Sequence, residues 1–154
     1  MRRNDREITE RSEIFDIIGA AQVCHIAMSD HDLPYIVAMN FGFDPDAPAL
    51  YLHSAGEGRK IRILSRNPAV CFQFDVDHHL VTGDAACDWG MSYRSVVGTG
   101  TAQILTGDGE KARGLDFIME HYSGKRGFKY PGEQLASTSV IRIAISELRG
   151  KKKG

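Results

Sequence analysis

The sequence has 154 residues, of which 42% are hydrophobic and 25% are charged. Chains of this length and composition fold as one globular unit and bury roughly 70% of their unfolded surface. The 19 basic and 20 acidic residues leave a net charge of −1, which excludes the large basic excess typical of nucleic-acid-binding proteins. We therefore predict one domain over residues 1–150, followed by a solvated basic tail over residues 151–154.

The three cysteines are too few for the disulfide framework of a small secreted protein. No apolar run approaches about 18 residues, so we expect no membrane partner. No signal-peptide pattern opens the sequence, which favours the cytoplasm. Cys24 and Cys71 lie inside strand-like runs, where we expect small, buried hydrophobic side chains. No Cys-x-x-Cys or His-x-x-x-His spacing is present, so we expect no metal site.

The spacing of apolar residues predicts a first helix, followed by a succession of short strands that two further helices interrupt. Three segments have helical spacing: residues 8–21, Gly58–Asn67 and Gly109–Tyr122. Residues 123–133 have the composition of a long loop. Strand-like runs are Val23–Ser29, Pro34–Asn40, Leu50–His53, Val70–Val76, Ser95–Leu105 and Ser139–Ser146. Short strands in close succession predict a mainly β fold, in which helices pack around an antiparallel sheet or barrel.

The stretch LHSAGEGRK, residues 52–60, leads from a predicted strand through two glycines into a predicted helix. Such a turn presents unpaired backbone N–H groups and the positive end of the helix dipole, which together attract anions. Ser54 adds a hydroxyl donor, while Arg59 and Lys60 add a bidentate donor and a compact charge. The pattern suits a phosphate monoester. It is neither a P-loop nor a dinucleotide fingerprint, and the alternative interpretation is a solvated basic helix face.

The same stretch continues as GRKIRILSRNPAVCFQFDVD. It stands in order with PYIVAMNFGFD, ACDWGMSYRSVVGTGTA and VIRIAISELRGK. Taken together, these motifs resemble the pyridoxamine 5′-phosphate oxidase-like FMN-binding split-barrel family, and in particular its nitroimidazole-resistance-protein-like branch. The resemblance covers nearly the whole chain. It implies a split antiparallel β-barrel with flanking helices.

The resemblance also implies a homodimer that holds flavin mononucleotide (FMN) in clefts at the interface between the two subunits. The glycine turn would contact the phosphate, and a barrel strand would run along the isoalloxazine ring. The residues carried over are Ser54, Gly58, Arg59 and Lys60 for the phosphate, and Ile36, Val37, Ala38, Met39 and Asn40 for the ring. The alternative for the strand residues is packing in the barrel core.

Two further features carry implied roles. His53 matches a histidine that lies close to the flavin in the resembled branch, where it could donate or accept a proton; the alternative is a structural strand-end residue. In the resembled family, the region matching residues 87–95 faces the flavin of the other subunit. This implies cofactor contacts from Trp89, Tyr93, Arg94 and Ser95 of the partner chain, with dimer packing as the alternative.

The implied activity is that of an FMN-dependent oxidoreductase that reduces a small acceptor, with a nitroaromatic or nitroimidazole compound as one candidate. NAD(P)H is the candidate electron donor, although no separate nicotinamide-binding domain is visible. The alternative is a flavin- or haem-binding storage protein without rapid turnover, against which the phosphate-type turn favours a phosphorylated cofactor. The ending SELRGKKKG lacks the aromatic and arginine residues of the vitamin B6 oxidases, so that activity is not expected.

Overall fold

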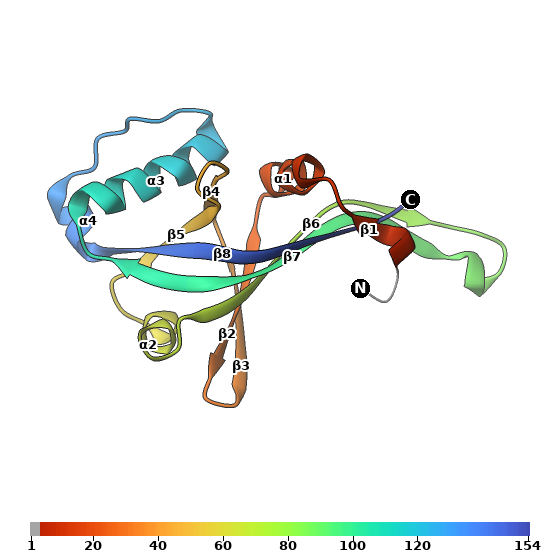
Figure 1. Cartoon of the computed structure of the whole chain (residues 1–154), viewed down its shortest axis with the longest axis horizontal. Coiled ribbons are helices and arrows are strands. Elements are labelled where there is room, and N and C mark those ends of the chain that lie inside the picture. The colour runs from red at the N-terminus through yellow and green to blue at the C-terminus, as the bar shows by residue number, and fades with distance from the viewer. Residues whose placement is uncertain (1–3) are drawn as a thin grey trace.

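The computed structural model describes residues 4–154. Its centre is an antiparallel sheet in the order β3-β2-β6-β7-β8-β5-β4, with β1 paired to β8 (Figure 1). The strands are β1 (Glu7–Ile8), β2 (Cys24–Asp30), β3 (Leu33–Met39), β4 (Phe41–Asp44), β5 (Ala49–Ala55), β6 (Ala69–Val81), β7 (Gly90–Leu105) and β8 (Thr138–Lys153). The helices are α1 (Arg11–Ala20), α2 (Arg59–Arg66), α3 (Asp108–Ser123) and α4 (Gly132–Ser137), with 3₁₀ turns η1 (Asn4–Arg6) and η2 (Ala86–Asp88). The predicted mainly β fold with peripheral helices is confirmed.

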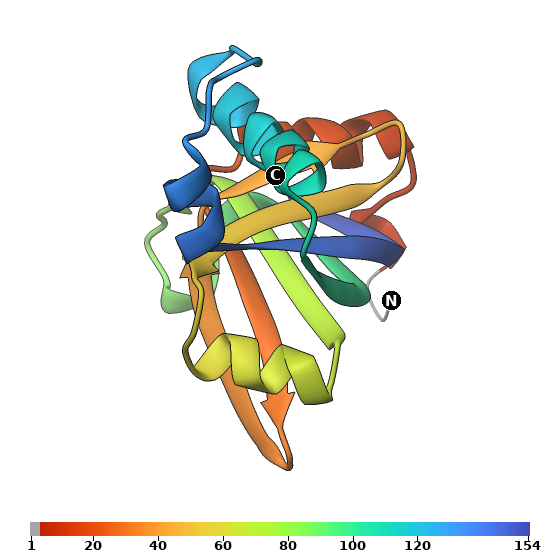
Figure 2. The same ribbon diagram turned by 90° about the vertical axis from the view of Figure 1, so that its left-hand side faces the viewer.

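The sheet curls on itself because its two end strands follow one another in the chain. β3 ends at Met39 and β4 begins at Phe41, so Asn40 alone connects one end of the strand order to the other. Two Cα–Cα steps reach at most about 7 Å, so the two ends of the sheet meet there. Figure 2 shows the strands curving around a common centre, with α2 at one end and α1 and α3 at the other.

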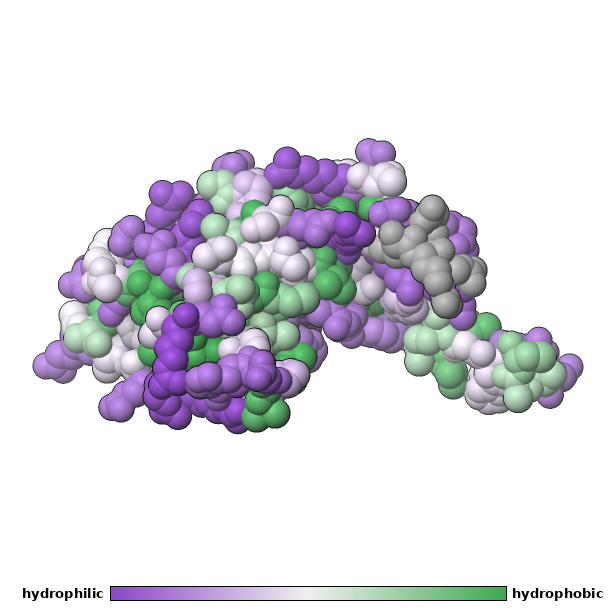
Figure 3. Space-filling view, turned by 60° about the horizontal axis from the view of Figure 1, so that its bottom comes forward, coloured by the Kyte–Doolittle hydropathy of each residue, from purple (hydrophilic) through white to green (hydrophobic). Residues whose placement is uncertain are grey.

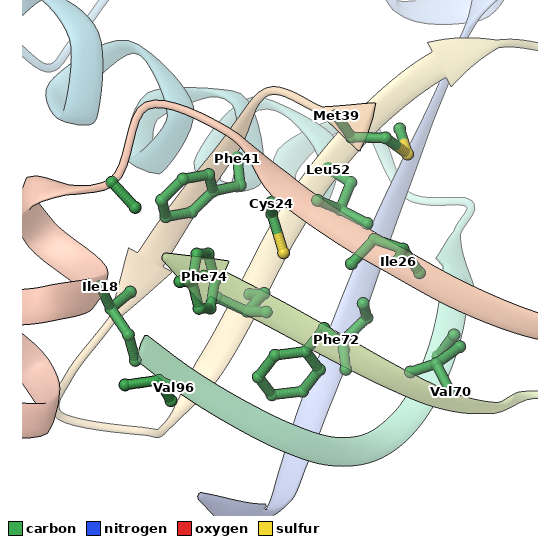
Figure 4. Packing of buried hydrophobic residues seen from close by; sticks show 14 of the residues in the cluster. Ile18, Cys24, Ile26, Met39, Phe41, Leu52, Val70, Phe72, Phe74 and Val96 are labelled. Atoms are coloured by element: carbon green, nitrogen blue, oxygen red, sulfur yellow. The ribbon is translucent and has the colours of Figure 1, made fainter. Parts of the chain in front are cut away.

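Aromatic side chains from β4 and β6, which are not neighbours in the strand order, fill the barrel. Phe41 and Phe74 have ring centroids 4.8 Å apart, and Phe72 and Phe74 are 5.9 Å apart (Figure 4). Cys24 lies among these rings and is fully buried, as predicted. The prediction for Cys71 is wrong, because its side chain is exposed on β6. Successive strand residues face opposite sides of the sheet, and Phe72 occupies the inward position.

The helices cover the ends and one side of this barrel. α2 buries Ile63 and Leu64 against the strands. α3 lies on the outer side of β4 and β5, where the Tyr51 and Phe117 rings stack with centroids 4.9 Å apart. A Cβ atom at Gly42 would lie 2.3 Å from the Phe117 backbone, so only glycine lets α3 approach β4 this closely.

Strands β6 and β7 continue beyond the barrel as a hairpin over residues 77–92, which we call the arm. Figure 1 shows it leaving the body of the molecule, and Figure 3 shows hydrophobic surface along it. At its base Asp77 adopts a φ of 57°, and the strand pairing shifts register between Val76 and His79. Leu80 is 62% exposed and Trp89 is 52% exposed. The arm therefore presents apolar side chains that its own chain does not cover.

Several boundaries differ from the sequence-based expectation. Three short elements were not predicted, because they are too short to show a periodic pattern: β1, β4 and α4. Three strands are longer than predicted: β6, β7 and β8. The predicted basic tail is wrong, since Lys151, Lys152 and Lys153 end β8 and pair with the first part of β7. The hydrogen bonds between paired strands use backbone groups, so a strand can continue through residues whose side chains are charged and lie at the surface. Among the described residues, no helix has the length and apolar character needed to cross a membrane.

Candidate functional site

Five residues predicted to hold the cofactor line one surface pocket of about 250 Å³. They are Ala38, Met39, Asn40, His53 and Lys60. The pocket forms where the end of β3, the end of β5 and the first turn of α2 meet. The sixth lining residue is Val23, which is 40% exposed just before β2. Val23 was not predicted as a site residue, because an apolar residue at the start of a strand-like run has the pattern of a core residue.

β3 supplies the pocket with a free strand edge. Within residues 4–154 it pairs only with β2, so its other edge presents unpaired backbone N–H and C=O groups. Ile36 and Ala38 point away from the core, while Val37 and Met39 are more buried. A row of alternating donors and acceptors therefore lies beside the pocket. These are the groups that hydrogen-bond the polar edge of a heteroaromatic ring.

The turn between β5 and α2 is held in place by the last residue of α4 and the first part of β8. The Gly56 N–H donates to the Ser137 carbonyl at 3.1 Å, and the Ser139 hydroxyl donates to the Gly56 carbonyl at 3.4 Å. Gly58 then adopts a φ of 140°, which favours glycine, and α2 begins at the next residue. The Ser54 hydroxyl donates to the Ala55 carbonyl at 2.9 Å. The first N–H groups of α2 thus emerge from a fixed turn.

Arg59 and Lys60 lie next to each other in sequence but have different surroundings. Arg59 donates its Nε–H to Asp30 Oδ2 at 3.3 Å, and its guanidinium lies 4.6 Å from the centroid of the Tyr35 ring. Both partners belong to the β2–β3 hairpin. Lys60 lines the pocket instead. The structure therefore places one of the two predicted cations in the pocket and ties the other to its rim.

His53 ends the buried part of β5 and contributes to the pocket wall. It stands opposite Val140 of β8, and its side chain is exposed. Within the described part of the chain, its imidazole makes no hydrogen bond or ion pair with another side chain. An imidazole with both nitrogens available can donate a hydrogen bond to a bound molecule and accept one from it.

The remaining predicted residues form a second group at the arm. The Trp89 Nε1–H donates to the Gly83 carbonyl at 2.7 Å, which ties the indole to the arm itself. Arg94 donates to Asp77 Oδ2 at 2.6 Å. Because strand side chains alternate, Tyr93 and Ser95 lie on the face of β7 opposite to Arg94. The structure thus separates the four residues onto two faces.

The pocket group and the arm group lie at opposite ends of β8. Ser54 pairs with Ser139 near the start of this strand, and Ser95 pairs with Lys151 near its end. Twelve residues of extended strand span about 40 Å, and Figure 1 shows β8 crossing most of the width of the molecule. A single chain therefore cannot bring both groups to one flavin.

One face of the sheet is uncovered between the two groups. Its outward positions carry Ala27, Ile36, Ala38, Cys71, Val97 and Thr99 on neighbouring strands. Ile36 is 63% exposed and Val97 is 45% exposed. Ala38 belongs both to this outer face and to the pocket. His25 and Gln73 lie between Ala38 and Val97 in the strand register, so the face is mixed, with exposed apolar side chains at Ile36 and Val97.

The histidines near the arm are engaged locally. His78 Nε2 lies 3.0 Å from Asp75 Oδ2, and His79 Nδ1 lies 3.0 Å from the Asp77 carbonyl oxygen. Over residues 4–154, no three histidine, cysteine, aspartate or glutamate side chains group in a way that could hold a metal ion.

Comparisons with known proteins show the family and the fold of this chain. A "putative 5-nitroimidazole antibiotic resistance protein" from Bacteroides thetaiotaomicron is 34% identical, over 95% of this chain and 86% of that one, with a TM-score of 0.83. The flavocytochrome Anf3 from Azotobacter vinelandii is 19% identical, over 100% of this chain and 72% of that one, with a TM-score of 0.84. An FAD- and haem-binding protein from Mycobacterium smegmatis is 19% identical, over 97% of this chain and 74% of that one, with a TM-score of 0.86.

The two likenesses at 19% identity show the shared fold alone. A search of functionally curated proteins found no match. The sequence model of the family described as Pyridoxamine 5'-phosphate oxidase matches residues 10–152. The resemblance to the nitroimidazole-resistance-protein-like branch is confirmed by the relative at 34% identity. On this match and on its split-barrel architecture, the chain belongs to the pyridoxamine 5′-phosphate oxidase family.

Proposed function

We propose that the protein is an FMN-dependent oxidoreductase that acts as a homodimer and reduces a small acceptor. One observation carries the proposal: the free edge of β3, His53, Lys60 and the turn into α2 converge on a single pocket. The relative at 34% identity, whose name refers to 5-nitroimidazole resistance, supports a nitroimidazole or another nitroaromatic compound as the acceptor.

The turn before α2 fits the phosphate group of FMN. No atom lies within 4 Å of the position that a Cβ atom at Gly58 would occupy, so the backbone there is open to an approaching anion. The first-turn N–H groups of α2 and the Lys60 ammonium would supply the hydrogen bonds and charge. The Ser54 hydroxyl would join them by turning away from the Ala55 carbonyl, to which it now donates. Arg59 would act from the rim, where Asp30 now holds it.

The edge of β3 would hold the flavin ring. When bound, FMN supplies the electron transfer, while the protein orients the ring and limits its contact with water. Backbone groups from Ile36 to Met39 would hydrogen-bond the polar edge of the ring, and Asn40 would add a side-chain amide. His53, at the pocket wall, would hold or release the proton that accompanies reduction of an acceptor. NAD(P)H is the proposed electron donor.

A second copy of the chain would complete the site. The separation of about 40 Å between the two groups of residues means that the arm reaches a flavin only across an interface. The uncovered outer face runs into the pocket through Ala38, so a partner packed on this face would border the flavin. Tyr93 and Ser95 on the outer face and the exposed Trp89 would supply the partner contacts. Arg94 would hold the base of the arm through Asp77.

The decisive experiment is the visible spectrum of the purified protein, followed by acid release of the chromophore and its identification by mass. We expect the two bands of oxidised flavin, released FMN, and reduction of metronidazole with NADH or NADPH. A Soret band would instead support the haem-binding alternative. A colourless protein that does not bind added FMN would refute the cofactor proposal.

A further inference from the structure

A second pocket of about 240 Å³ lies under α3, away from the proposed flavin site. It is lined by Asp44, Ala47, Tyr51, Leu105, Glu110, Arg113 and Arg142. None of these residues lines the first pocket. β4, β5, β7, β8 and α3 all contribute to its wall. The proposed oxidoreductase function assigns no role to it.

The acid at the base of this pocket is already satisfied by the protein. Asp44 is 3% exposed, and its Oδ1 accepts the N–H groups of Asp46 and Ala47, each at 3.1 Å. Its Oδ2 lies 3.5 Å from Arg113 Nη2. Asp44 therefore holds the turn after β4 and neutralises Arg113. Neither group needs a ligand.

Tyr51 presents a polar atom that the protein leaves unused. The residue is only 5% exposed, because its ring stacks on Phe117 at an interplanar angle of 3°. Its hydroxyl has no hydrogen-bond partner among residues 4–154. Every fully buried side-chain N or O atom in this range does have a partner, so the Tyr51 hydroxyl is not fully buried. The hydroxyl must therefore reach solvent, and the pocket that Tyr51 lines provides the opening.

Arg142 stands directly opposite Tyr51 in the β5–β8 ladder, so the two side chains share one face of the sheet. The arginine is partly buried, and within the described residues it forms no ion pair or side-chain hydrogen bond. A guanidinium withdrawn from water without a counter-charge is stabilised by an anion. Its planar fork matches the two oxygens of a carboxylate.

The other charges limit which anion fits. Glu110 Oε2 lies 3.3 Å from the position that a Cβ atom at Gly107 would take, so this carboxylate folds back to the start of α3. With Asp44 it places two negative charges near the pocket, against Arg113 and Arg142. The two carboxylates would repel a dianion such as phosphate more strongly than a monoanion. A monoanion that pairs with Arg142 therefore suits the pocket better. Leu105 and Ala47 offer an apolar wall for the rest of the ligand.

We propose that this pocket binds a small organic monocarboxylate. Its carboxylate pairs with Arg142 and accepts a hydrogen bond from the Tyr51 hydroxyl, while its apolar body contacts Leu105 and Ala47. This site is independent of the proposed flavin site, since the two pockets have no residue in common.

Isothermal titration of the purified protein, with its flavin content recorded, tests the proposal. The probes are benzoate, its neutral analogue benzamide, and inorganic phosphate. We expect benzoate to bind at least tenfold more tightly than either of the others. Arg142→Gln should weaken benzoate binding at least tenfold, and Tyr51→Phe, which keeps the stacked ring, severalfold. Arg149→Gln is the matched control on the same strand, because Arg149 pairs with the exposed Glu147 outside the pocket and should leave benzoate binding unchanged.

Two results would overturn the proposal: no benzoate binding by the unaltered protein at millimolar concentration, or binding that Arg142→Gln leaves unchanged. The second would mean that benzoate binds elsewhere, including at the flavin pocket. Circular dichroism and flavin content of each variant should match those of the unaltered protein. A protein that neither contains flavin nor binds added FMN, but binds benzoate through Arg142, would refute the proposed function and keep this site.

Discussion

Arg59 donates its Nε–H to Asp30 Oδ2 at 3.3 Å, although sequence alone would place this arginine on the same anion as Lys60. Tyr35 supports the guanidinium from below at 4.6 Å. Two neighbouring cations therefore have unequal access to the pocket, because the β2–β3 hairpin holds the first and leaves the second free.

We expect Lys60→Ala to weaken FMN binding more than Arg59→Ala does. Lys60 lines the pocket, and a hydrogen bond to a charged group contributes about 1.5–3 kcal/mol, which corresponds to roughly 10- to 150-fold in affinity. Titration of the flavin-free variants with FMN, followed by flavin fluorescence, measures both effects. Arg66→Ala, in the last turn of the same helix, serves as the control. Equal affinities for all three variants would remove the phosphate assignment.

His53→Gln should retain FMN but slow reduction of the acceptor by about 10²- to 10⁴-fold, the usual contribution of a positioned proton donor. Stopped-flow measurement of flavin reoxidation by metronidazole tests this. An unaltered rate would leave His53 as a structural residue.

Val97→Asp should convert the proposed dimer into monomers and lower its flavin content. The residue lies at the middle of the uncovered outer face, where the proposed interface would take two symmetry-related carboxylates out of water. The cross-strand neighbour of each is Arg149, which already pairs with Glu147. Light scattering and the visible spectrum provide the measurements. Phe128→Asp is the control, because Phe128 is also exposed but lies in the loop before α4. A dimeric, yellow Val97→Asp protein would show that this face is not the interface.

Alkaline pH should destabilise the fold through Cys24. Burial raises the pKa of the Cys24 thiol above its ordinary value of 9.0. The folded protein then keeps a proton that the unfolded chain releases, so the contribution to stability is complete below pH 9.0 and is lost as pH rises. The loss is about 1.4 kcal/mol per pH unit. Urea unfolding between pH 8 and 10 should show a stability that is level below about pH 9 and falls above it, and Cys24→Ala should abolish the fall.

A narrow pH range is needed for that measurement because of Tyr130. Burial, followed by its hydrogen bond to Asp116, raises the pKa of the Tyr130 hydroxyl above 10.0. The unfolded chain again releases this proton at lower pH than the folded protein does, so Tyr130 lowers the stability of the fold only above about pH 10. A slope that persists in Cys24→Ala below pH 10 would contradict the assignment to Cys24.

Sequence patterns sufficed wherever local spacing and packing agree. Periodic apolar residues identified α1 and α3, and alternation located the cores of β2, β3 and β5. Glycine and proline marked the limits of α2, because backbone conformation at these residues is set locally. The order of motifs along the chain was enough to indicate the family. Pocket residues such as His53 and Lys60 were found because each lies at the end of a predictable element.

Longer-range features were decided by the tertiary structure alone. Lys151 to Lys153 form a strand because β7 offers them backbone partners, and no side-chain pattern reports such pairing. Arg59 and Lys60 differ because a hairpin distant in sequence holds one of them. Tyr51 and Arg142 face one pocket only through a register between β5 and β8 that their own neighbours in sequence do not specify. Local sequence fixes backbone conformation, whereas the neighbours of each side chain depend on how distant strands align.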